Sequence, residues 1–243
     1  MGTRLTERDE RLLVKLAQCL WLTTAQIKRL YFPDGTLNAV QKRLRKLADD
    51  GYLRSHREHP TAEAVHAVGP KGKAAVEDKG VEAVLSSETP QHLEHMSGVN
   101  EIRIAAETSS IGVAWFFSYW ELPQLGWMHA VIPDAVFAAR APTRRSFVVE
   151  YDRATETLSK LLEKVRAYAH GIPAFAFEAV LVATERPRRI DLLSRGLRAG
   201  RPTLTVLATP ITAIAEQGFA SAEWVDVNDG TTRRIFDPAR KDV

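Results

Sequence analysis

The chain has one cysteine, Cys19, among its 243 residues, which excludes an internal disulfide and a cysteine-rich zinc site. No apolar run approaches the ~20 residues of a membrane-spanning helix, and the first residues lack an apolar signal core. These features predict a protein of the reducing cytoplasm with no membrane partner. A G-x-x-x-x-G-K-[ST] phosphate loop and a G-x-S-x-G nucleophile elbow are also missing, so we expect no nucleotide cofactor.

Charge is unevenly distributed along the chain. The net charge is +3, but residues 1–75 carry 14 Lys or Arg against 8 Asp or Glu, a net of +6. The remaining residues therefore carry a net charge of −3. A basic first third attached to an acidic remainder indicates that the first third meets a polyanion.

Residues 1–80 have the pattern of a winged-helix domain. Apolar residues at helical spacing predict helices over 7–18, about 24–31 and 36–50, with Thr residues as N-caps. Two short strands, 52–57 and 64–68, follow around a polar tip, and residues 71–79 look like a closing helix. This order is the winged variant of helix-turn-helix, in which the recognition helix enters the major groove of DNA.

The third predicted helix and the following hairpin carry the candidate DNA contacts. Amide side chains can read adenine, and arginine can read guanine, while other basic residues contact phosphates. The candidates are Asn38, Gln41, Lys42, Arg43, Arg45, Lys46, Arg54 and Arg57. A solvated basic face and a protein-binding surface are the alternatives, and a homodimer on double-stranded DNA is also compatible with the pattern.

Residues 81–90 are expected to be a linker, and residues 91–243 a second domain. A helix capped by Thr89-Pro90 precedes strands at 113–120, 131–140 and 145–152. A helix over 155–170 and a strand over 179–184 complete an α-β-β-β-α-β order, followed by a helix over 187–198 and a strand over 203–208. The overall fold class is therefore mixed, α+β or α/β.

Three carboxylates gather at one end of the predicted hairpin. If its turn centres on Pro142, residue i pairs with residue 284 − i, so Asp134 faces Glu150. Opposed Cβ atoms lie about 4.5–5.5 Å apart, and like charges there are destabilising. Asp152 shares the face of Glu150. A divalent cation such as Mg²⁺ or Mn²⁺ would relieve the repulsion, whereas pairing with nearby arginines is the structural alternative.

Pro133-Asp134 and Glu150-Tyr151-Asp152 resemble the motif of the PD-(D/E)xK nuclease superfamily, which has a restriction-endonuclease-like core of the same order. The sequence departs from the motif at Asp152, where the superfamily has lysine. The resemblance implies that a lysine can move to the next helix, where Lys164 and Tyr168 resemble its Gln-x-x-x-Tyr element. Lys160 is the rival candidate, and both lysines can instead be solvated partners of acidic neighbours.

The same resemblance implies a set of site residues. The metal ligands would be Asp134, Glu150 and Glu101, with Glu101 contributed by the first core helix. An alternative places Glu101 on the surface, beside Arg103 or Arg166. The catalytic group would comprise Asp134, Glu150, Asp152, Lys164 and Tyr168.

Much of residues 5–170 also resembles the replication-relaxation family. The matching stretches include His95-Met96-Ser97-Gly98-Val99-Asn100 and the run from Glu150 to Glu156. This resemblance implies a DNA-linked role in the replication of plasmids or mobile elements. We therefore expect a metal-dependent nickase or endonuclease. The alternatives are a non-catalytic DNA-binding regulator with a degenerate nuclease fold, and a protein adaptor that uses the apolar 115–120 strand.

Overall fold

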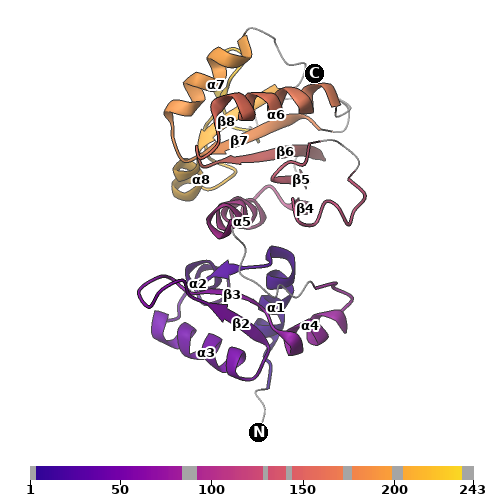
Figure 1. Ribbon diagram of the computed structural model, residues 1–243, viewed down its shortest axis with the longest axis vertical. Coiled ribbons are helices and arrows are strands. Elements are labelled where there is room, and N and C mark those ends of the chain that lie inside the picture. Colours follow the sequence, from indigo (N-terminus) through magenta and orange to yellow (C-terminus); the bar gives the residue numbers. More distant parts are fainter. Residues whose placement is uncertain are drawn as a thin grey trace. The chain divides into compact units, whose positions relative to one another are not determined.

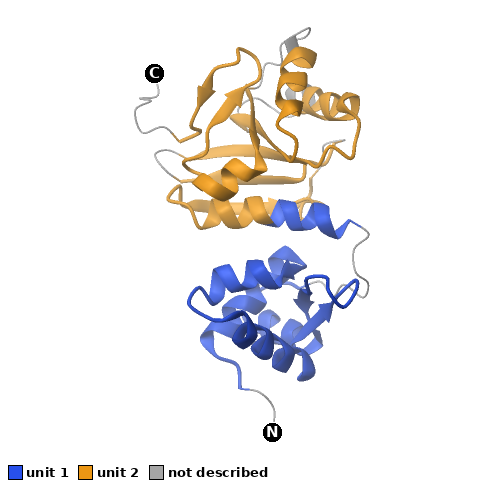
Figure 2. Cartoon of the chain, turned by 90° about the vertical axis from the view of Figure 1, so that its left-hand side faces the viewer, with its two compact units in different colours: residues 1–100 blue, residues 101–243 orange. Residues whose placement is uncertain are grey.

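The computed structural model describes residues 4–83, 92–127, 131–140, 144–171, 177–198 and 205–236. The chain forms two compact units, residues 1–100 and residues 101–243 (Figure 2). Both contain helices and strands, so the predicted mixed α/β class is confirmed. Thr89 and Pro90, and most of the expected linker, lie outside the described residues.

Within its described residues, unit 1 contains four complete helices and a small antiparallel sheet. The helices are α1 (Glu7–Cys19), α2 (Thr24–Tyr31), α3 (Leu37–Asp49) and α4 (Pro70–Glu77). The strands are β1 (Leu22–Thr23), β2 (Leu53–His56) and β3 (Val65–Val68), in the order β1-β3-β2. The predicted helices and hairpin strands are present, whereas β1 was not predicted because two residues are too short to show alternation.

Local sequence explains where the helices of unit 1 begin and end. Thr6, Thr23 and Thr36 cap α1, α2 and α3, each accepting a bond from a backbone N–H three residues on. Gly51 follows α3 with a φ of +81°, a conformation that glycine adopts without strain. The helices then bury one apolar stripe each, which includes Leu12, Leu13, Leu16, Ile27, Val40, Leu44 and Leu47.

Unit 2 is built on a seven-stranded sheet. Its strands are β4 (Val113–Ser118), β5 (Ala135–Ala139), β6 (Arg145–Asp152), β7 (Ala179–Thr184), β8 (Thr205–Pro210), β9 (Trp224–Asp226) and β10 (Thr232–Arg233). The sheet order is β10-β9-β8-β7-β6-β5-β4, with β6, β7 and β8 parallel and the other pairs antiparallel. Helix α5 (Leu93–Glu107) begins in unit 1 and ends in unit 2, and the other helices of unit 2 are α6 (Leu158–Gly171), α7 (Arg188–Arg198) and α8 (Ile211–Gln217).

The predicted pairing of the central hairpin is confirmed. Ala135 pairs with Val149 and Ala139 with Arg145, so i and j sum to 284 along the ladder. Strand β5 is shorter than expected, because residues 131–134 precede the ladder. Elements α5, β4, β5, β6, α6 and β7 follow one another in the predicted α-β-β-β-α-β order.

Two layers of helices cover the sheet of unit 2. Helices α6 and α7 lie over one face, and α5 and α8 over the other (Figure 1). The first face buries an aliphatic cluster that includes Val148, Val165, Val180 and Leu193. Because side chains alternate along a strand, Glu150 and Asp152 point to this α6–α7 face and Tyr151 to the opposite face.

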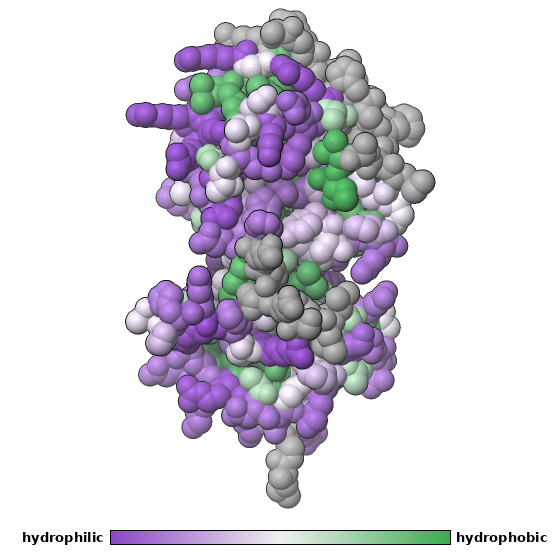
Figure 3. Space-filling view, viewed as in Figure 1, coloured by the Kyte–Doolittle hydropathy of each residue, from purple (hydrophilic) through white to green (hydrophobic). Residues whose placement is uncertain are grey.

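Hydrophilic residues dominate the surface seen in Figure 3, and hydrophobic residues form only small patches. Among the described residues, no helix combines the length and apolarity needed to cross a membrane.

Candidate nucleic-acid interface and carboxylate cluster

Helix α3 presents most of the predicted DNA contacts away from the core. Val40, Leu44 and Leu47 are buried, which fixes the rotation of the helix. On the remaining surface, Asn38, Lys42, Arg45 and Lys46 are exposed and Gln41 is half-buried. These side chains are therefore accessible to a partner along α3.

Arg43 has a different partner from the phosphate that the sequence suggests. Its guanidinium forms a two-pronged ion pair with Asp9 of α1, with Nε 3.0 Å from Oδ1 and Nη2 on Oδ2. The Asp9 side chain is fully buried and also accepts the backbone N–H of Thr6 at 2.8 Å. Burial alone would raise the pKa of Asp9, but the bonds from Arg43 and Thr6 outweigh it and lower that pKa. Arg43 therefore joins α3 to α1.

The hairpin supplies the other predicted contacts. Arg54 is half-buried on β2, an outer strand of the small sheet. Arg57 follows β2, is exposed, and donates from Nη1 to the carbonyl oxygen of Pro60 at 2.8 Å. This bond fixes the start of the hairpin tip.

His66 was not singled out from the sequence. It is 5% exposed on β3, with Nε2 3.0 Å from Thr24 Oγ1 and Nδ1 2.8 Å from Ser55 Oγ. Thr24 Oγ1 donates to the carbonyl of Ala64, so it accepts from His66 Nε2–H, and Nδ1 accepts from Ser55. Burial, and then the charge of Arg57, lower the pKa of His66 to about 4. The imidazole is therefore neutral near pH 7.

In unit 2, Asp134 directly precedes β5 and Glu150 lies near the end of β6, so both are at the same end of this strand pair. Asp134 is 7% exposed and its Oδ2 accepts the backbone N–H of Tyr151 at 2.7 Å, which anchors it beside β6. Glu150 is 1% exposed on β6. Burial, and then the charge of Asp134, raise the pKa of Glu150 to about 8. The two carboxylates therefore interact, as the hairpin register predicts.

Helix α6 brings two polar side chains to Glu150. Lys164 Nζ lies 3.3 Å from Glu150 Oε2 and 3.6 Å from Glu156. Tyr168, which is 1% exposed, donates its hydroxyl to Glu150 Oε1. Burial alone would lower the pKa of Lys164, but Glu150, Asp134 and Glu156 outweigh it and raise that pKa. Of the two lysine candidates, the structure thus brings Lys164 to the carboxylates, while the exposed Lys160 lies one turn earlier.

Asp152 is engaged by other groups. Arg189 of α7 holds it with two bonds of 2.9 Å each, one to each carboxylate oxygen. Thr184 Oγ1 donates to Oδ2 at 3.0 Å and the backbone N–H of Ala154 to Oδ1 at 2.9 Å. This carboxylate ties β6 to β7 and α7. The sequence did not indicate Arg189 as its partner, because the two residues are 37 positions apart.

The third predicted metal ligand, Glu101, is not grouped with the other two. The pKa of Tyr151 is raised, first by burial and then by Glu185. The charge of Glu101, a residue of α5, contributes to the same rise, so Glu101 lies near Tyr151. Tyr151 points away from Glu150, so Glu101 approaches the other face of β6. No three His, Cys, Asp or Glu side chains within the described ranges are arranged to hold a metal ion.

Two facing carboxylates still fit a magnesium-type ion. Mg²⁺ is usually held by one or two carboxylates together with substrate phosphates, rather than by an all-protein cage. Each oxygen of a carboxylate has two lone-pair sites, so Glu150 can accept from Tyr168 and Lys164 and still bind a cation. Asp134 and Glu150 are therefore the residues that would hold Mg²⁺ or Mn²⁺.

Comparison with protein families identifies a family that covers most of the described elements. The model of the family described as replication-relaxation matches residues 13–174, which is more than half of the chain. The matched segment includes α3, Asp134, Glu150 and Lys164. No curated protein and no solved structure matches the chain.

Proposed function

The chain belongs to the replication-relaxation family, and from this membership and the two sites we propose that it binds double-stranded DNA and cuts it by metal-dependent hydrolysis. The family implies a replication-related role. In this proposal unit 1 is a winged-helix domain that selects the DNA, and unit 2 is a nuclease-like domain that nicks or cleaves it.

The surface of α3 supports DNA binding by unit 1. A helix that follows a shorter helix and precedes a hairpin is the reading element of winged helix-turn-helix proteins. In this chain it exposes Asn38, Lys42, Arg45 and Lys46, which combine groups that read bases with groups that contact phosphates. Arg43 is excluded from the proposed contacts, because Asp9 engages it.

One observation carries the proposed cutting role: Lys164 Nζ reaches Glu150 while Asp134 faces the same group. These contacts support an Asp–Glu–Lys combination like that of the PD-(D/E)xK nuclease superfamily, with the lysine supplied by α6 in place of position 152. Asp152 has a structural role in this proposal, because Arg189 and Thr184 engage it.

Each residue of the cluster has a separate role in the proposed reaction. A Mg²⁺ or Mn²⁺ ion held by Asp134 and Glu150 would supply an activated water and offset phosphate charge. The Lys164 ammonium would stabilise negative charge that develops on the phosphoryl oxygens. Tyr168 would hold the Glu150 carboxylate in place through its hydroxyl.

A non-catalytic DNA-binding regulator is the second candidate. The observation that favours it is that the described residues offer two grouped carboxylates and no third. In that case Glu150, whose pKa is raised to about 8, would carry a proton near pH 7, and this proton would relieve the repulsion from Asp134 without a metal ion. Unit 2 would then serve as a scaffold.

Calorimetry with Mn²⁺ separates the two candidates. We expect wild-type protein to bind Mn²⁺, and Asp134→Asn and Glu150→Gln to weaken binding by at least about tenfold, because each removes one ligand charge. Glu163→Gln on the exposed side of α6 is the matched control and should bind as wild type does. If wild-type protein binds no Mn²⁺, with or without duplex DNA, the catalytic proposal fails and the regulator remains.

Nicking of supercoiled DNA then tests the chemistry. Lys164→Met should retain Mn²⁺ binding and slow nicking by about 100-fold, the usual effect of removing one charge-stabilising donor.

Thermal unfolding without metal gives an independent readout. Asp134→Asn should raise the stability of unit 2, because it removes the repulsion from Glu150 and keeps an oxygen for the Tyr151 N–H. A destabilised variant would indicate a purely structural aspartate.

A further inference from the structure

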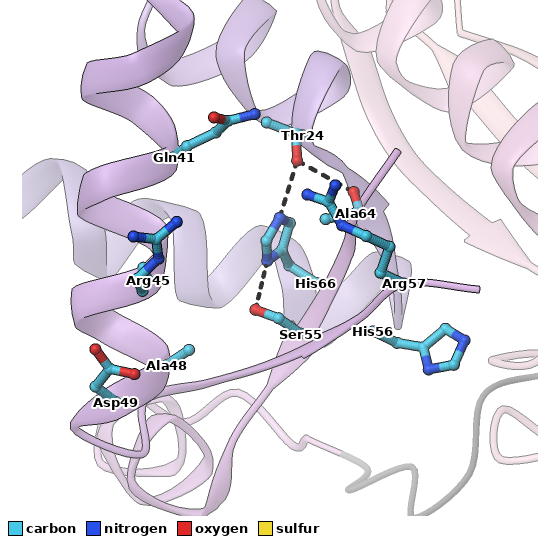
Figure 4. Close-up of a pocket in the computed structure, with 10 residues that line it drawn as sticks. All are labelled: Thr24, Gln41, Arg45, Ala48, Asp49, Ser55, His56, Arg57, Ala64 and His66. Atoms are coloured by element: carbon cyan, nitrogen blue, oxygen red, sulfur yellow. Dashed lines mark hydrogen bonds between the residues drawn. The ribbon is translucent and has the colours of Figure 1, made fainter. Parts of the chain in front are cut away.

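A pocket of about 290 Å³ opens between α3 and the hairpin of unit 1. Gln41, Arg45 and Asp49 line one wall at a spacing of four residues, which places them on one face of α3. Ser55, Arg57 and His66 line the other side. Figure 4 shows the Arg45 and Arg57 side chains on opposite sides of His66.

His66 gives the pocket a fixed floor. Its ring is held from both sides by Thr24 and Ser55, so the imidazole cannot rotate without losing a hydrogen bond. The ring is neutral and buried, and it presents a planar surface between two guanidinium groups. The imidazole of the pocket is therefore preorganised, and the exposed side chains of Arg45 and Arg57 flank it.

The lining combines two kinds of recognition. Guanidinium groups bind phosphate with paired hydrogen bonds and stack on planar rings. The Gln41 amide can donate and accept, and the Asp49 carboxylate can accept, along the edge of a base, as such groups do in nucleic-acid recognition. Ala48 and Ala64 leave room between these groups. The volume lies at the small end of ligand pockets, which begin at roughly 300 Å³.

We propose that this pocket binds one nucleotide, with its phosphate between Arg45 and Arg57 and its base against the Gln41–Asp49 wall. The nucleotide can come from a free mononucleotide or from an unpaired position in a DNA strand, because the pocket addresses the same chemical unit in both. Gln41, Arg45 and Arg57 are also proposed duplex contacts, so an occupied pocket competes with duplex binding. That competition, but not the nucleotide site itself, rests on the DNA-binding role proposed above.

Calorimetry of the full chain tests the site without duplex DNA. The probes are guanosine and adenosine 5′-monophosphates, a mixed-sequence single-stranded oligonucleotide, free nucleosides and inorganic phosphate. We expect a monophosphate or the oligonucleotide to bind at least about tenfold more tightly than nucleoside or phosphate alone. Only these probes carry both a phosphate for the two arginines and a base for the Gln41–Asp49 wall. Binding by monophosphates identifies the free ligand as a source, and binding by the oligonucleotide alone identifies the strand.

Two variants show whether the pocket is responsible. Ala48→Leu should fill the space and weaken binding by at least about tenfold. The same change at Ala74, on the exposed side of α4 and outside the pocket, should leave binding unchanged. If Ala48→Leu does not fold, Arg57→Gln on the surface replaces it and should weaken binding of the phosphate-bearing probes. Wild-type protein that binds no nucleotide probe, or that binds phosphate equally well, overturns the proposal, as does unchanged binding in the pocket variants.

A fluorescence anisotropy titration with duplex DNA then separates this inference from the proposed function. Displacement of bound duplex by the nucleotide probe is the expected result. If wild-type protein binds the nucleotide probe but does not bind duplex DNA, only the DNA-binding proposal is contradicted. Simultaneous binding of duplex and nucleotide contradicts the competition.

Discussion

The buried ion pair between Arg43 and Asp9 makes a quantitative prediction. Arg43→Met keeps most of the aliphatic stem and removes the charge that balances a fully buried carboxylate. Breaking a buried pair by removing one partner costs about 3–5 kcal/mol, because the remaining charge is left uncompensated. Asp9 keeps its bonds from Thr6, and the Arg43 side chain is 21% exposed, so we expect the lower end, about 3 kcal/mol.

This loss should be visible as a local change in unit 1. For a domain of about 100 residues it corresponds to a fall in Tm of roughly 10–20 °C. Hydrogen–deuterium exchange read peptide by peptide assigns the change to α1 and α3 and leaves unit 2 as an internal reference. Lys46→Met, the same type of change at an exposed position of α3, is the matched control and should shift stability by less than about 0.5 kcal/mol.

A double variant completes the test. Asp9→Leu combined with Arg43→Met should cost less than Arg43→Met alone, because no charge remains buried. Equal effects of Arg43→Met and Lys46→Met would refute the reasoning. Arg43 would then be better described as a surface residue, and its predicted phosphate contact would regain support.

Three further predictions concern other positions. Gly72→Ala should cost about 3 kcal/mol in urea unfolding, since its Cβ would lie 2.2 Å from the carbonyl oxygen of Tyr52, and an unchanged midpoint would contradict this close approach. The pKa of His66 is about 4 in the folded protein and ordinarily 6.5, so between these pH values the unfolded chain binds more protons than the folded chain. The free energy of unfolding of unit 1 should therefore fall by about 3 kcal/mol as the pH drops from 6.5 to 4. His66→Gln should reduce this dependence of stability on pH. Asp152→Asn should weaken the link to Arg189 and cost about 3 kcal/mol in unit 2, while the folded variant still binds Mn²⁺; loss of Mn²⁺ binding without unfolding would give Asp152 a direct role.

The parts of the fold that depend on local pattern were predictable from the sequence. Strand alternation, with a turn assumed to centre on Pro142, predicted the β5–β6 register, so the approach of Asp134 to Glu150 followed from counting residues. Helical spacing located α3 to within one residue at each end. Residues four apart share a helix face, which placed Lys164 and Tyr168 on the same side of α6.

Contacts between distant segments were not predictable in the same way. Arg43 reaches Asp9 and Arg189 reaches Asp152 across 34 and 37 residues, through the packing of one element on another. A single sequence contains no periodicity that encodes such pairs. The capping box of Thr6 and Asp9 was readable in principle, but its fit to an arginine of another helix was not. The same limit applies to the pocket beside His66.

The balance of charge separates the buried carboxylates of this protein into two groups. Asp9, Asp152 and Asp226 each pair with one arginine, so each is neutralised within the fold. Glu150 pairs with Lys164, but it is also buried beside a second carboxylate, that of Asp134, whose charge opposes its ionisation. Burial first, and then the charge of Asp134, raise the pKa of Glu150. A divalent cation would offset the repulsion between these two carboxylates, and this repulsion is the physical reason for the binding role proposed for the cluster.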